Sequence, residues 1–395
     1  MDFRLLHIAA CVLTSLAIQN VLADQPRRQL RLPDPPYAYA NVDWPEHFAE
    51  VIDRFDNTPD DNSITDAGAT LGRVLFYDTT LSVSGKTSCA SCHQQKLAFT
   101  DDAKLSVGHQ GETVRRNSMS LINSRFYQRG KFFWDERART LEDQVLMPIQ
   151  DEIEMGHDLA ELETQLRDDP IYPPLFDAAF GSPEICADEI AKALAQFVRS
   201  IVSYRSKYDV GRAQVRSVAQ AFPNYTAEEN RGKEIFLGRG RCASCHFSNG
   251  IPRVQADGGR PPRQNAFFHM LRPVANGVDA DVPDVDQGVG GFNSVDLDIG
   301  RFKSPSLRNV EVTGPYMHDG RFVTIHQVIE HYNWSVKPHP NLGGSLRLAS
   351  KEGLALREPE KNALAAFLFT LTDHELLRDP KFSDPFVDNS SGVAD

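Results

Sequence analysis

One pentapeptide that combines two thiols with an imidazole occurs twice in this chain. Cys-Ala-Ser-Cys-His stands at residues 89–93 and again at 242–246. Cys-x-x-Cys-His is the spacing at which a c-type haem is attached covalently, through one thioether bond per thiol. The His that follows can then bind the haem iron. The predicted thioether positions are Cys89, Cys92, Cys242 and Cys245, and the predicted iron ligands are His93 and His246.

A zinc site and a redox dithiol are the other interpretations of a Cys pair. Zinc would need two Cys pairs close together, or a Cys pair with a later His-x₃₋₅-His. Here the pairs lie far apart in the sequence, and each has its own His directly attached. The spacing therefore favours two haems. Of the two remaining cysteines, Cys186 is expected to be a buried thiol without a catalytic role, and Cys11 lies in the N-terminal apolar run.

The first residues are typical of an export signal. A positive residue precedes an apolar run from Leu5 to Ala17, and a small-residue cleavage site ends at Ala23. The run is shorter than the about 20 apolar residues of a membrane span, and no later segment is long and apolar enough. Lipoprotein cleavage before Cys11 is the alternative. We expect residues 1–23 to be a signal peptide and the mature chain to work in the periplasm.

Length and charge narrow the classes of function. A chain of 395 residues predicts two domains once the signal is removed. The formal net charge of −12 argues against binding to nucleic acid, whose phosphates favour basic surfaces. An acidic surface could instead steer a basic redox partner.

The two halves also repeat an order of elements. Gly-x-x-x-Phe precedes the pentapeptide at residues 72–76 and 232–236, and an amphipathic segment with helical spacing follows at residues 190–201 and 364–371. This order predicts a tandem duplication of one helical domain.

Local signals predict several boundaries. Thr226 and Glu229 have the spacing of a capping box, and Asp188 is a candidate cap of the first closing helix. Residues 206–225 are the expected link between the domains. The polar tail after Asp379 is expected to fray.

Six further blocks resemble the bacterial di-haem cytochrome c peroxidase superfamily, which includes MauG. They occur in the family's order around the two haem motifs, at residues 71–78, 132–137, 141–144, 148–156, 302–309 and 314–320. The resemblance implies a mainly α fold of two tandem cytochrome-c-like haem domains with long connecting loops. Residues 24–210 would form the peroxidatic domain, and residues 211–395 the electron-transfer domain.

The resemblance also implies roles around the first haem. Gln144 and Glu154 match the Gln and Glu of the family's peroxide pocket. A carboxylate over the iron can take a proton from one peroxide oxygen and return it to the other. Trp134 matches the Trp between the haems, where an indole can relay electrons. His109 matches the His that closes the resting haem as its sixth ligand in typical peroxidases.

The predicted ligand of the second haem resembles that of MauG instead. Tyr332 stands where peroxidases place a Met ligand and MauG-like members place Tyr, and Met317 is a competing ligand. A phenolate stabilises ferric iron, whereas a thioether raises the potential. The chain therefore combines a peroxidase-type His109 with a MauG-type Tyr332.

A calcium ion between the domains is a further family feature. The matching ligands are Asn117, Thr313 and Pro315, whose oxygen atoms suit calcium. His318 and Arg308 are candidates for groups that support the haem ligands.

Together these residues predict a periplasmic peroxidase that reduces hydrogen peroxide to water with electrons from a small cytochrome c or cupredoxin. The alternative is a MauG-like enzyme that uses peroxide to oxidise Tyr or Trp of a partner protein. A plain di-haem electron carrier would not explain Gln144 and Glu154. A homodimer is possible by family analogy.

Overall fold

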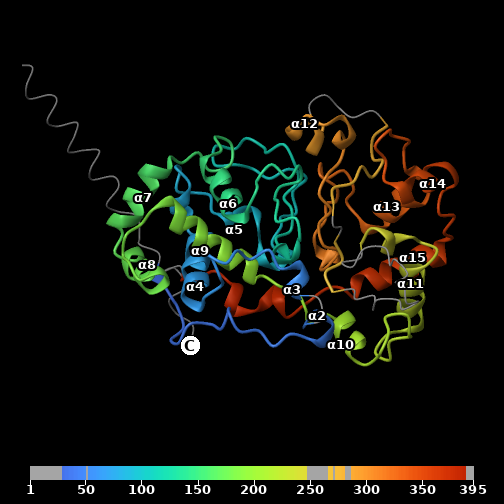
Figure 1. Cartoon of the computed structure of the whole chain (residues 1–395), viewed down its shortest axis with the longest axis horizontal. Helices are drawn as coiled ribbons and strands as arrows, with labels where there is room; N and C mark the ends of the chain where they lie inside the picture. Colours follow the sequence, from blue (N-terminus) through green and yellow to red (C-terminus); the bar gives the residue numbers. More distant parts are fainter. Residues whose placement is uncertain (1–28, 50–51, 247–265, 270–271, 281–285, 388–395) are drawn as a thin grey trace, which may run out of the picture.

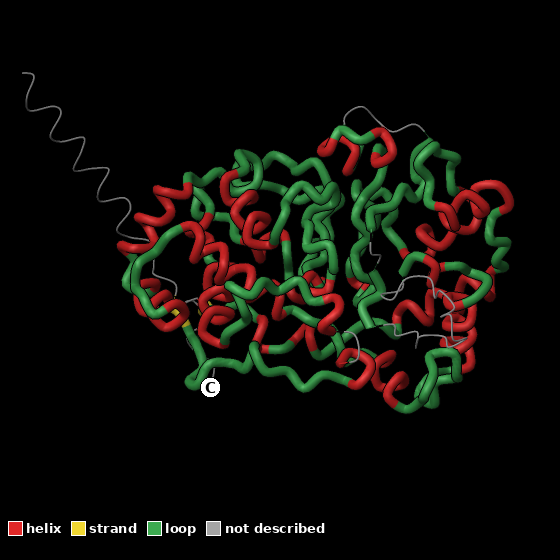
Figure 2. Tube along the Cα trace, viewed as in Figure 1, coloured by secondary structure: helices red, strands yellow, loops and turns green. Residues whose placement is uncertain are grey.

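The protein consists of two helical lobes that lie side by side (Figure 1). This computed structural model describes residues 29–49, 52–246, 266–269, 272–280 and 286–387. The predicted signal peptide and Cys11 lie outside the described residues. Loops and turns make up much of the region between the lobes (Figure 2), and the architecture is mainly α, as predicted.

The helices are short and follow the predicted order. The α-helices are α2 (Glu46–Ala49), α3 (Ile52–Phe55), α4 (Asp66–Tyr77), α5 (Cys89–Cys92), α6 (Leu141–Gln150), α7 (Leu159–Asp168), α8 (Tyr172–Phe180), α9 (Ala187–Ser200), α10 (Lys207–Ala213), α11 (Ala227–Leu237), α12 (Val289–Asn293), α13 (Ile325–Glu330), α14 (Gly344–Glu352) and α15 (Glu358–Phe369). A π-helix, η7, spans His331–Ser335, and 3₁₀ turns include η4 (Cys242–Ser244). The strands β1 (Gln29–Leu30) and β2 (Phe386–Val387) pair antiparallel.

The same helix crossing holds each lobe together. In the first lobe α4 packs on α9, with Gly72 so close that an added Cβ would lie 2.0 Å from the Ala193 carbonyl oxygen. In the second lobe α11 packs on α15, and a Cβ on Gly232 would lie 1.8 Å from the Ala363 carbonyl oxygen. Only glycine allows two backbones to approach so closely. The predicted duplication is therefore visible as two equivalent helix pairs.

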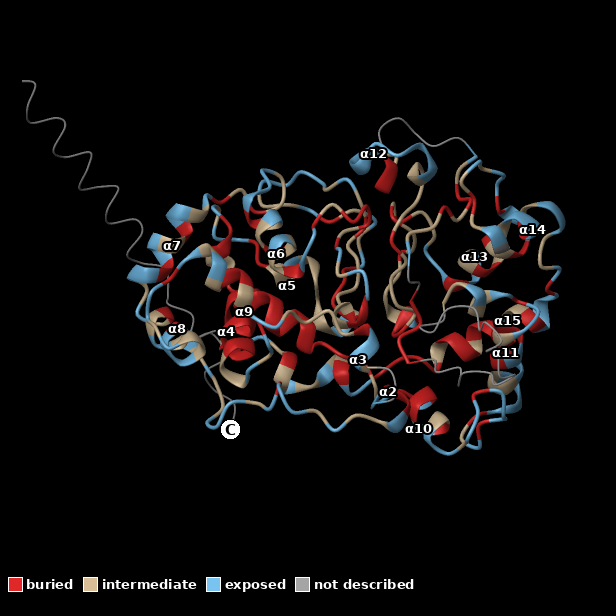
Figure 3. Ribbon diagram, viewed as in Figure 1, coloured by how far each residue is buried: buried red, intermediate tan, exposed pale blue. Residues whose placement is uncertain are grey.

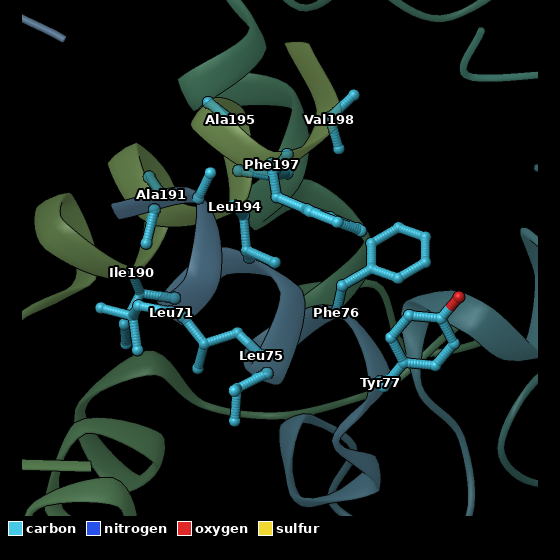
Figure 4. Packing of buried hydrophobic residues seen from close by; sticks show 14 of the residues in the cluster. Leu71, Leu75, Phe76, Tyr77, Ile190, Ala191, Leu194, Ala195, Phe197 and Val198 are labelled. Atoms are coloured by element: carbon cyan, nitrogen blue, oxygen red, sulfur yellow. The ribbon is translucent and has the colours of Figure 1, made fainter. Parts of the chain in front are cut away.

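Apolar side chains fill the space around both crossings. Figure 4 shows Leu71, Leu75 and Phe76 of α4 packed against Leu194 and Phe197 of α9. A second buried cluster lies between α11 and α15. Figure 3 shows α4 and α9 as largely buried, whereas α11 and α15 each bury one face. Each lobe therefore has its own hydrophobic core.

A second duplicated unit follows the first. Phe132 and Ala138 form a bridge across a tight loop, and so do Tyr316 and Phe322. Each loop leads into a helix with a threonine N-cap, Thr140 for α6 and Thr324 for α13. These loops face each other where the lobes meet.

The N-termini of α11 and α9 bear on three sequence predictions, of which one is confirmed and two are wrong. Thr226 and Glu229 form the predicted capping box of α11. Asp188 is not a cap, because α9 begins one residue earlier and Cys186 is its N-cap. That position also leaves Cys186 exposed, so the prediction of a buried thiol is wrong.

The C-terminal tail is ordered through Val387, contrary to the expected fraying. It returns to the first lobe, where the Tyr39 hydroxyl donates to the Lys381 carbonyl at 2.6 Å and Arg73 Nε donates to the Ser383 carbonyl at 2.9 Å. Because Lys381 and Ser383 bind the first lobe, a division of the chain at residue 210 stays a prediction.

Candidate active site

The first pentapeptide forms one wall of a cavity in the first lobe. Cys89 and Cys92 bound the single turn of α5, and His93 follows as its C-cap. The cavity encloses about 630 Å³, and all three residues line it. The other walls come from the helices α4, α6 and α9 and from loops, and they are largely apolar: Phe76, Leu121, Val145, Leu194 and Val198. A cavity of this size and character suits a flat apolar cofactor.

The hydrogen bond of the His93 ring leaves its other nitrogen free to bind an iron ion. Its Nδ1 atom lies 2.8 Å from the Phe99 carbonyl oxygen. A carbonyl only accepts, so Nδ1 must carry the proton and Nε2 keeps its lone pair. This is the arrangement that orients metal-binding histidines. Burial also lowers the pKa of His93, which keeps the ring neutral.

The thiols do not have the properties of a redox dithiol. Burial raises the pKa of Cys89 to about 12 and that of Cys92 to about 11, where Asp101 adds to the effect. A reactive dithiol needs a lowered thiol pKa. Two protonated thiols and a neutral His on one apolar wall fit covalent haem attachment instead.

Gln144 and Glu154 face the same cavity as His93. Gln144 lies in the first turns of α6, which Thr140 caps, and Glu154 lies in the loop after that helix. Burial raises the pKa of Glu154 to about 7, with a further contribution from Asp151. A carboxyl group with this pKa exchanges protons readily near neutral pH.

His109 lies at the edge of this cavity and does not line it in the described arrangement. Its neighbour Gly108 does line the cavity. The Nε2 atom of His109 lies 3.0 Å from the Glu152 carbonyl oxygen, and its buried Nδ1 has no hydrogen-bond partner in the described structure. The loop would have to move to bring the His109 ring over the cavity, so the role of His109 as a ligand stays a prediction.

The second pentapeptide forms a wall of a larger, more apolar cavity. The cavity encloses about 890 Å³ and is lined by Cys242, Cys245 and His246. Burial raises the pKa of Cys242 to about 12 and lowers that of His246 to about 4. The Nδ1 atom of His246 makes no hydrogen bond of ordinary geometry with the described residues, although the Phe268 backbone lies near enough to raise its pKa slightly. This cavity fits a second haem on the same grounds as the first.

Tyr332 and Met317 approach this site from one side. Both line a neighbouring cavity that also contains His246, and Tyr332 lines the haem cavity itself. Asn276 donates through Nδ2 to the Met317 sulfur at 3.3 Å. Burial raises the pKa of Tyr332, and a hydrogen bond with the Asn276 side chain offsets only part of this effect. Tyr332 lines the haem cavity and Met317 does not, so Tyr332 has the more direct access to a haem.

Trp134 lines a cavity at the junction of the lobes that also contains His246. Its indole Nε1 donates to the Asn117 carbonyl at 2.8 Å, and its ring lies 6.5 Å from the His318 ring, centre to centre. The Lys303 backbone N–H donates to the Trp134 carbonyl, and the Asn117 N–H donates to the His318 carbonyl. Trp134 and His318 thus occupy equivalent places in the two duplicated loops.

The three predicted calcium ligands come together at this junction. Asn117, Thr313 and Pro315 line one cavity of about 910 Å³ between the lobes. The amide nitrogen of Asn117 donates to the Ala103 and Lys104 carbonyls, which leaves its side-chain oxygen for another partner. The arrangement is compatible with an oxygen-ligated ion, and calcium itself stays a prediction.

Two residues that line the cavity between the lobes were not among the predicted site residues, although one of them, Lys303, lies in the family block at 302–309. Lys303 is buried at the junction, over the rings of Tyr127 and Phe132, and burial lowers its pKa to about 7. Asn276 is a loop residue with no motif around it. Conversely, Arg308 supports the linker, because both of its terminal nitrogens bind Asp209, at 2.6 and 2.8 Å.

The described residues lack two kinds of feature. Within residues 29–387, leaving aside the stretches without a description, no three His, Cys, Asp or Glu residues form a metal-binding group. No helix in the same stretches is long and apolar enough to cross a membrane.

The comparisons with known proteins agree with this geometry. A sequence profile described as di-haem cytochrome c peroxidase matches residues 66–215. Cytochrome-c peroxidase IdrP1 of Denitromonas iodatirespirans is 30% identical over 82% of this chain and 86% of its own length. The methylamine utilization protein MauG of Paracoccus denitrificans is 35% identical over 78% of this chain and 89% of its own length.

A solved structure gives the same result. The crystal structure of a MauG-like protein associated with microbial copper homeostasis matches with a TM-score of 0.72 at 31% identity. The match covers 87% of this chain and 99% of that chain. The chain therefore belongs to the di-haem cytochrome c peroxidase family of oxidoreductases, which implies two c-type haems and a reaction with peroxide.

Proposed function

We propose that this protein is a periplasmic peroxidase that reduces hydrogen peroxide to water in its first lobe, with electrons delivered through its second lobe. The observation that carries the proposal is the convergence of Gln144, Glu154 and His93 on one cavity. The second cavity has no such polar pair among the residues that line it.

The bound haem would supply iron that exchanges electrons with peroxide. The chain supplies proton transfer and positioning. The Glu154 carboxylate accepts a proton from one peroxide oxygen and returns it to the other as the O–O bond breaks, and its pKa of about 7 suits both steps. Gln144 holds the peroxide through its amide. Two electrons and two further protons complete the conversion of one peroxide to two waters.

Electrons enter through the second lobe and cross by way of Trp134. The indole is held by its hydrogen bond to Asn117, at the point where the duplicated loops meet. His109 regulates access: a movement of its loop would place the ring over the cavity in the resting enzyme. A calcium ion on Asn117, Thr313 and Pro315 would tie this junction together.

The test is peroxide turnover by the haem-loaded enzyme with the small electron donor tetramethyl-p-phenylenediamine (TMPD). Glu154→Gln removes the proton carrier while keeping size and hydrogen bonding, and we expect turnover to fall by about a hundredfold or more. Glu152→Gln is the matched control, because Glu152 is exposed and lies two residues away. Turnover of Glu154→Gln near the wild-type rate, at equal haem content, would reject the proposal.

A MauG-like oxidation of a partner protein is the second candidate, and Tyr332 is the observation that favours it. Here peroxide would still react in the first lobe, but the electrons would come from Tyr or Trp side chains of the partner. Mass spectrometry of the partner after peroxide treatment distinguishes the two: oxidised Tyr or Trp supports this candidate, whereas fast turnover with a reduced cytochrome or cupredoxin supports the first.

A further inference from the structure

The side chain of Trp334 is 59% exposed, which is unusual for so large an apolar group. The other two tryptophans are packed: Trp134 is buried at the junction of the lobes, and Trp44 stacks on Phe48. Trp334 belongs to the π-helix η7, and π-helical turns frequently occur at functional sites.

The same short helix holds Tyr332, on the wall of the second haem cavity. Asn333 between them is fully buried and fixes the turn, because its carbonyl accepts from the Leu354 N–H at 2.8 Å and its side chain bonds the backbone of Leu356 at 2.8 and 3.1 Å. Tyr332 therefore lies inward and Trp334 outward on one rigid turn.

A single layer of backbone separates the indole from the cavity. A Cβ added to Gly353 would lie 2.5 Å from Trp334 Cε3, so the ring rests directly on this backbone. The next residue, Leu354, lines the haem cavity. An oxidisable ring thus spans the distance between the cavity wall and the solvent.

The surface around Trp334 is apolar and basic, although the whole chain is acidic. Leu348 on the neighbouring helix α14 is 40% exposed, and the exposed charges of this helix are Arg347, Lys351 and Glu352. Lys337, just after η7, is 53% exposed. A carboxylate lies 4.0 Å from Lys337, but that group already binds an arginine at 2.8 Å. With Arg321 and its two carboxylates included, four cations stand against three carboxylates: Arg321, Lys337, Arg347 and Lys351 against Asp279, Asp319 and Glu352. This local excess of positive charge, on a chain of net charge −12, favours a partner with an acidic face.

We propose that Trp334 is the entry point for electrons into the second haem, at a docking surface for a small acidic redox protein. This surface comprises Trp334, Lys337, Leu348 and Lys351. When peroxide has oxidised the haem pair, the second haem would draw one electron at a time from the indole, and the reduced metal centre of the partner would return each electron to the indole. Peroxide is the oxidant, the partner is oxidised, and no bond is made or broken at Trp334. The inference rests on the proposed function and adds the place and the charge of the donor.

The first test mixes the haem-loaded protein, freshly oxidised with one equivalent of peroxide, with reduced plastocyanin, an acidic cupredoxin, and follows reduction of the haems by stopped flow. Trp334→Phe keeps an apolar ring but removes the oxidisable indole, and we expect reduction to slow by about tenfold or more. Trp334→Tyr should restore part of the rate. Phe292→Leu, at another exposed aromatic residue, is the matched control and should react as wild type. A wild-type rate for Trp334→Phe would overturn the relay.

The second test separates docking from electron transfer. Lys337→Glu and Lys351→Glu should weaken plastocyanin binding in calorimetry and lower the rate of reduction by about tenfold at low salt, an effect that disappears at high salt. Lys96→Glu in the first lobe is the matched control. Unchanged binding in both lysine variants, or faster reduction by a basic cytochrome c than by plastocyanin at low salt, would overturn the acidic-partner assignment.

Peroxide turnover with TMPD keeps this inference distinct from the proposed function. TMPD is small and does not need a docking surface, so turnover should be the same in Trp334→Phe and wild type. If wild type fails to turn over peroxide with TMPD, the proposed function fails. If wild type succeeds and Trp334→Phe also accepts electrons from plastocyanin normally, only the inference fails.

Discussion

The two lobes share a framework but differ at the position above the haem. Four residues after its threonine N-cap, the first lobe has Gln144 and the second has Val328. Eight residues after the cap, the first lobe has Pro148 and the second has Tyr332. All four side chains line the cavity of their own lobe. The duplication has therefore kept the packing and changed the chemistry.

The comparison of the two lobes separates the features that maintain the fold from those that carry the chemistry. The glycine crossings and threonine caps recur in both lobes, as stability requires. Among the described residues a carboxyl group lines only the first of the two haem cavities, where Glu154 lies in the loop after α6. At the corresponding point the second lobe continues from α13 into the π-helix and presents Tyr332.

The largest expected effect is on the pH dependence of turnover. Peroxide must give a proton to the Glu154 carboxylate, and burial raises the pKa of this group to about 7. Below pH 7 the group is increasingly protonated, so turnover with TMPD should fall by about tenfold per pH unit. The acid limb should be absent in Glu154→Gln. A flat profile between about pH 5 and pH 8 in wild type would contradict the assignment of the proton carrier to the first lobe.

The buried arginines of the two lobes should differ in a measurable way. Arg308 is fully buried with Asp209, which is 4% exposed, whereas Arg199 pairs with Glu142, which is 20% exposed. Removing one partner of a buried pair costs about 3–5 kcal/mol, because the other charge is left unpaired. We expect Arg308→Met to lower the free energy of unfolding by about this amount, and Arg199→Met by less, since water can reach Glu142.

Urea unfolding of the two variants checks this order. His47 also contacts Asp209, with Nε2 2.8 Å from Oδ1, and joins the first lobe to the linker. Equal losses in the two variants, or a larger loss in Arg199→Met, would show that the linker is not the more tightly coupled region.

The smallest effect should be the same in both lobes. Gly72→Ala and Gly232→Ala each place a methyl group about 2 Å from a helix carbonyl, so each helix pair must move apart. Overpacking of this kind costs about 1–3 kcal/mol. Thermal unfolding should show similar losses for the two variants. A loss in only one would mean that the two crossings are not equivalent, whatever their geometry.

Local chemistry was predictable from the sequence, whereas long-range placement was not. The pentapeptides, the capping box at Thr226 and the duplicated helices depend on residues close in sequence. The return of the C-terminal tail to the first lobe depends on contacts such as Tyr39 to Lys381, which no local pattern encodes. The burial of Lys303 and the contact between Asn276 and Met317 have the same origin.

The candidate site shows the same division. The family blocks predicted Gln144, Glu154 and Trp134. The first two line the cavity of the first lobe and Trp134 lines the cavity between the lobes, while their roles stay predictions. The orientation of His109 depends on how one loop packs against the Glu152 carbonyl, which the spacing from His93 does not determine.

The central claim is that the first lobe reacts with peroxide and the second supplies electrons. The most direct measurement is a stopped-flow record of the haem Soret band after peroxide is added to Glu154→Gln and to Tyr332→Phe. The first reaction should slow by about a hundredfold or more in Glu154→Gln and keep its rate in Tyr332→Phe. A slow reaction in Tyr332→Phe together with a normal one in Glu154→Gln would show that peroxide reacts in the second lobe and would contradict the account.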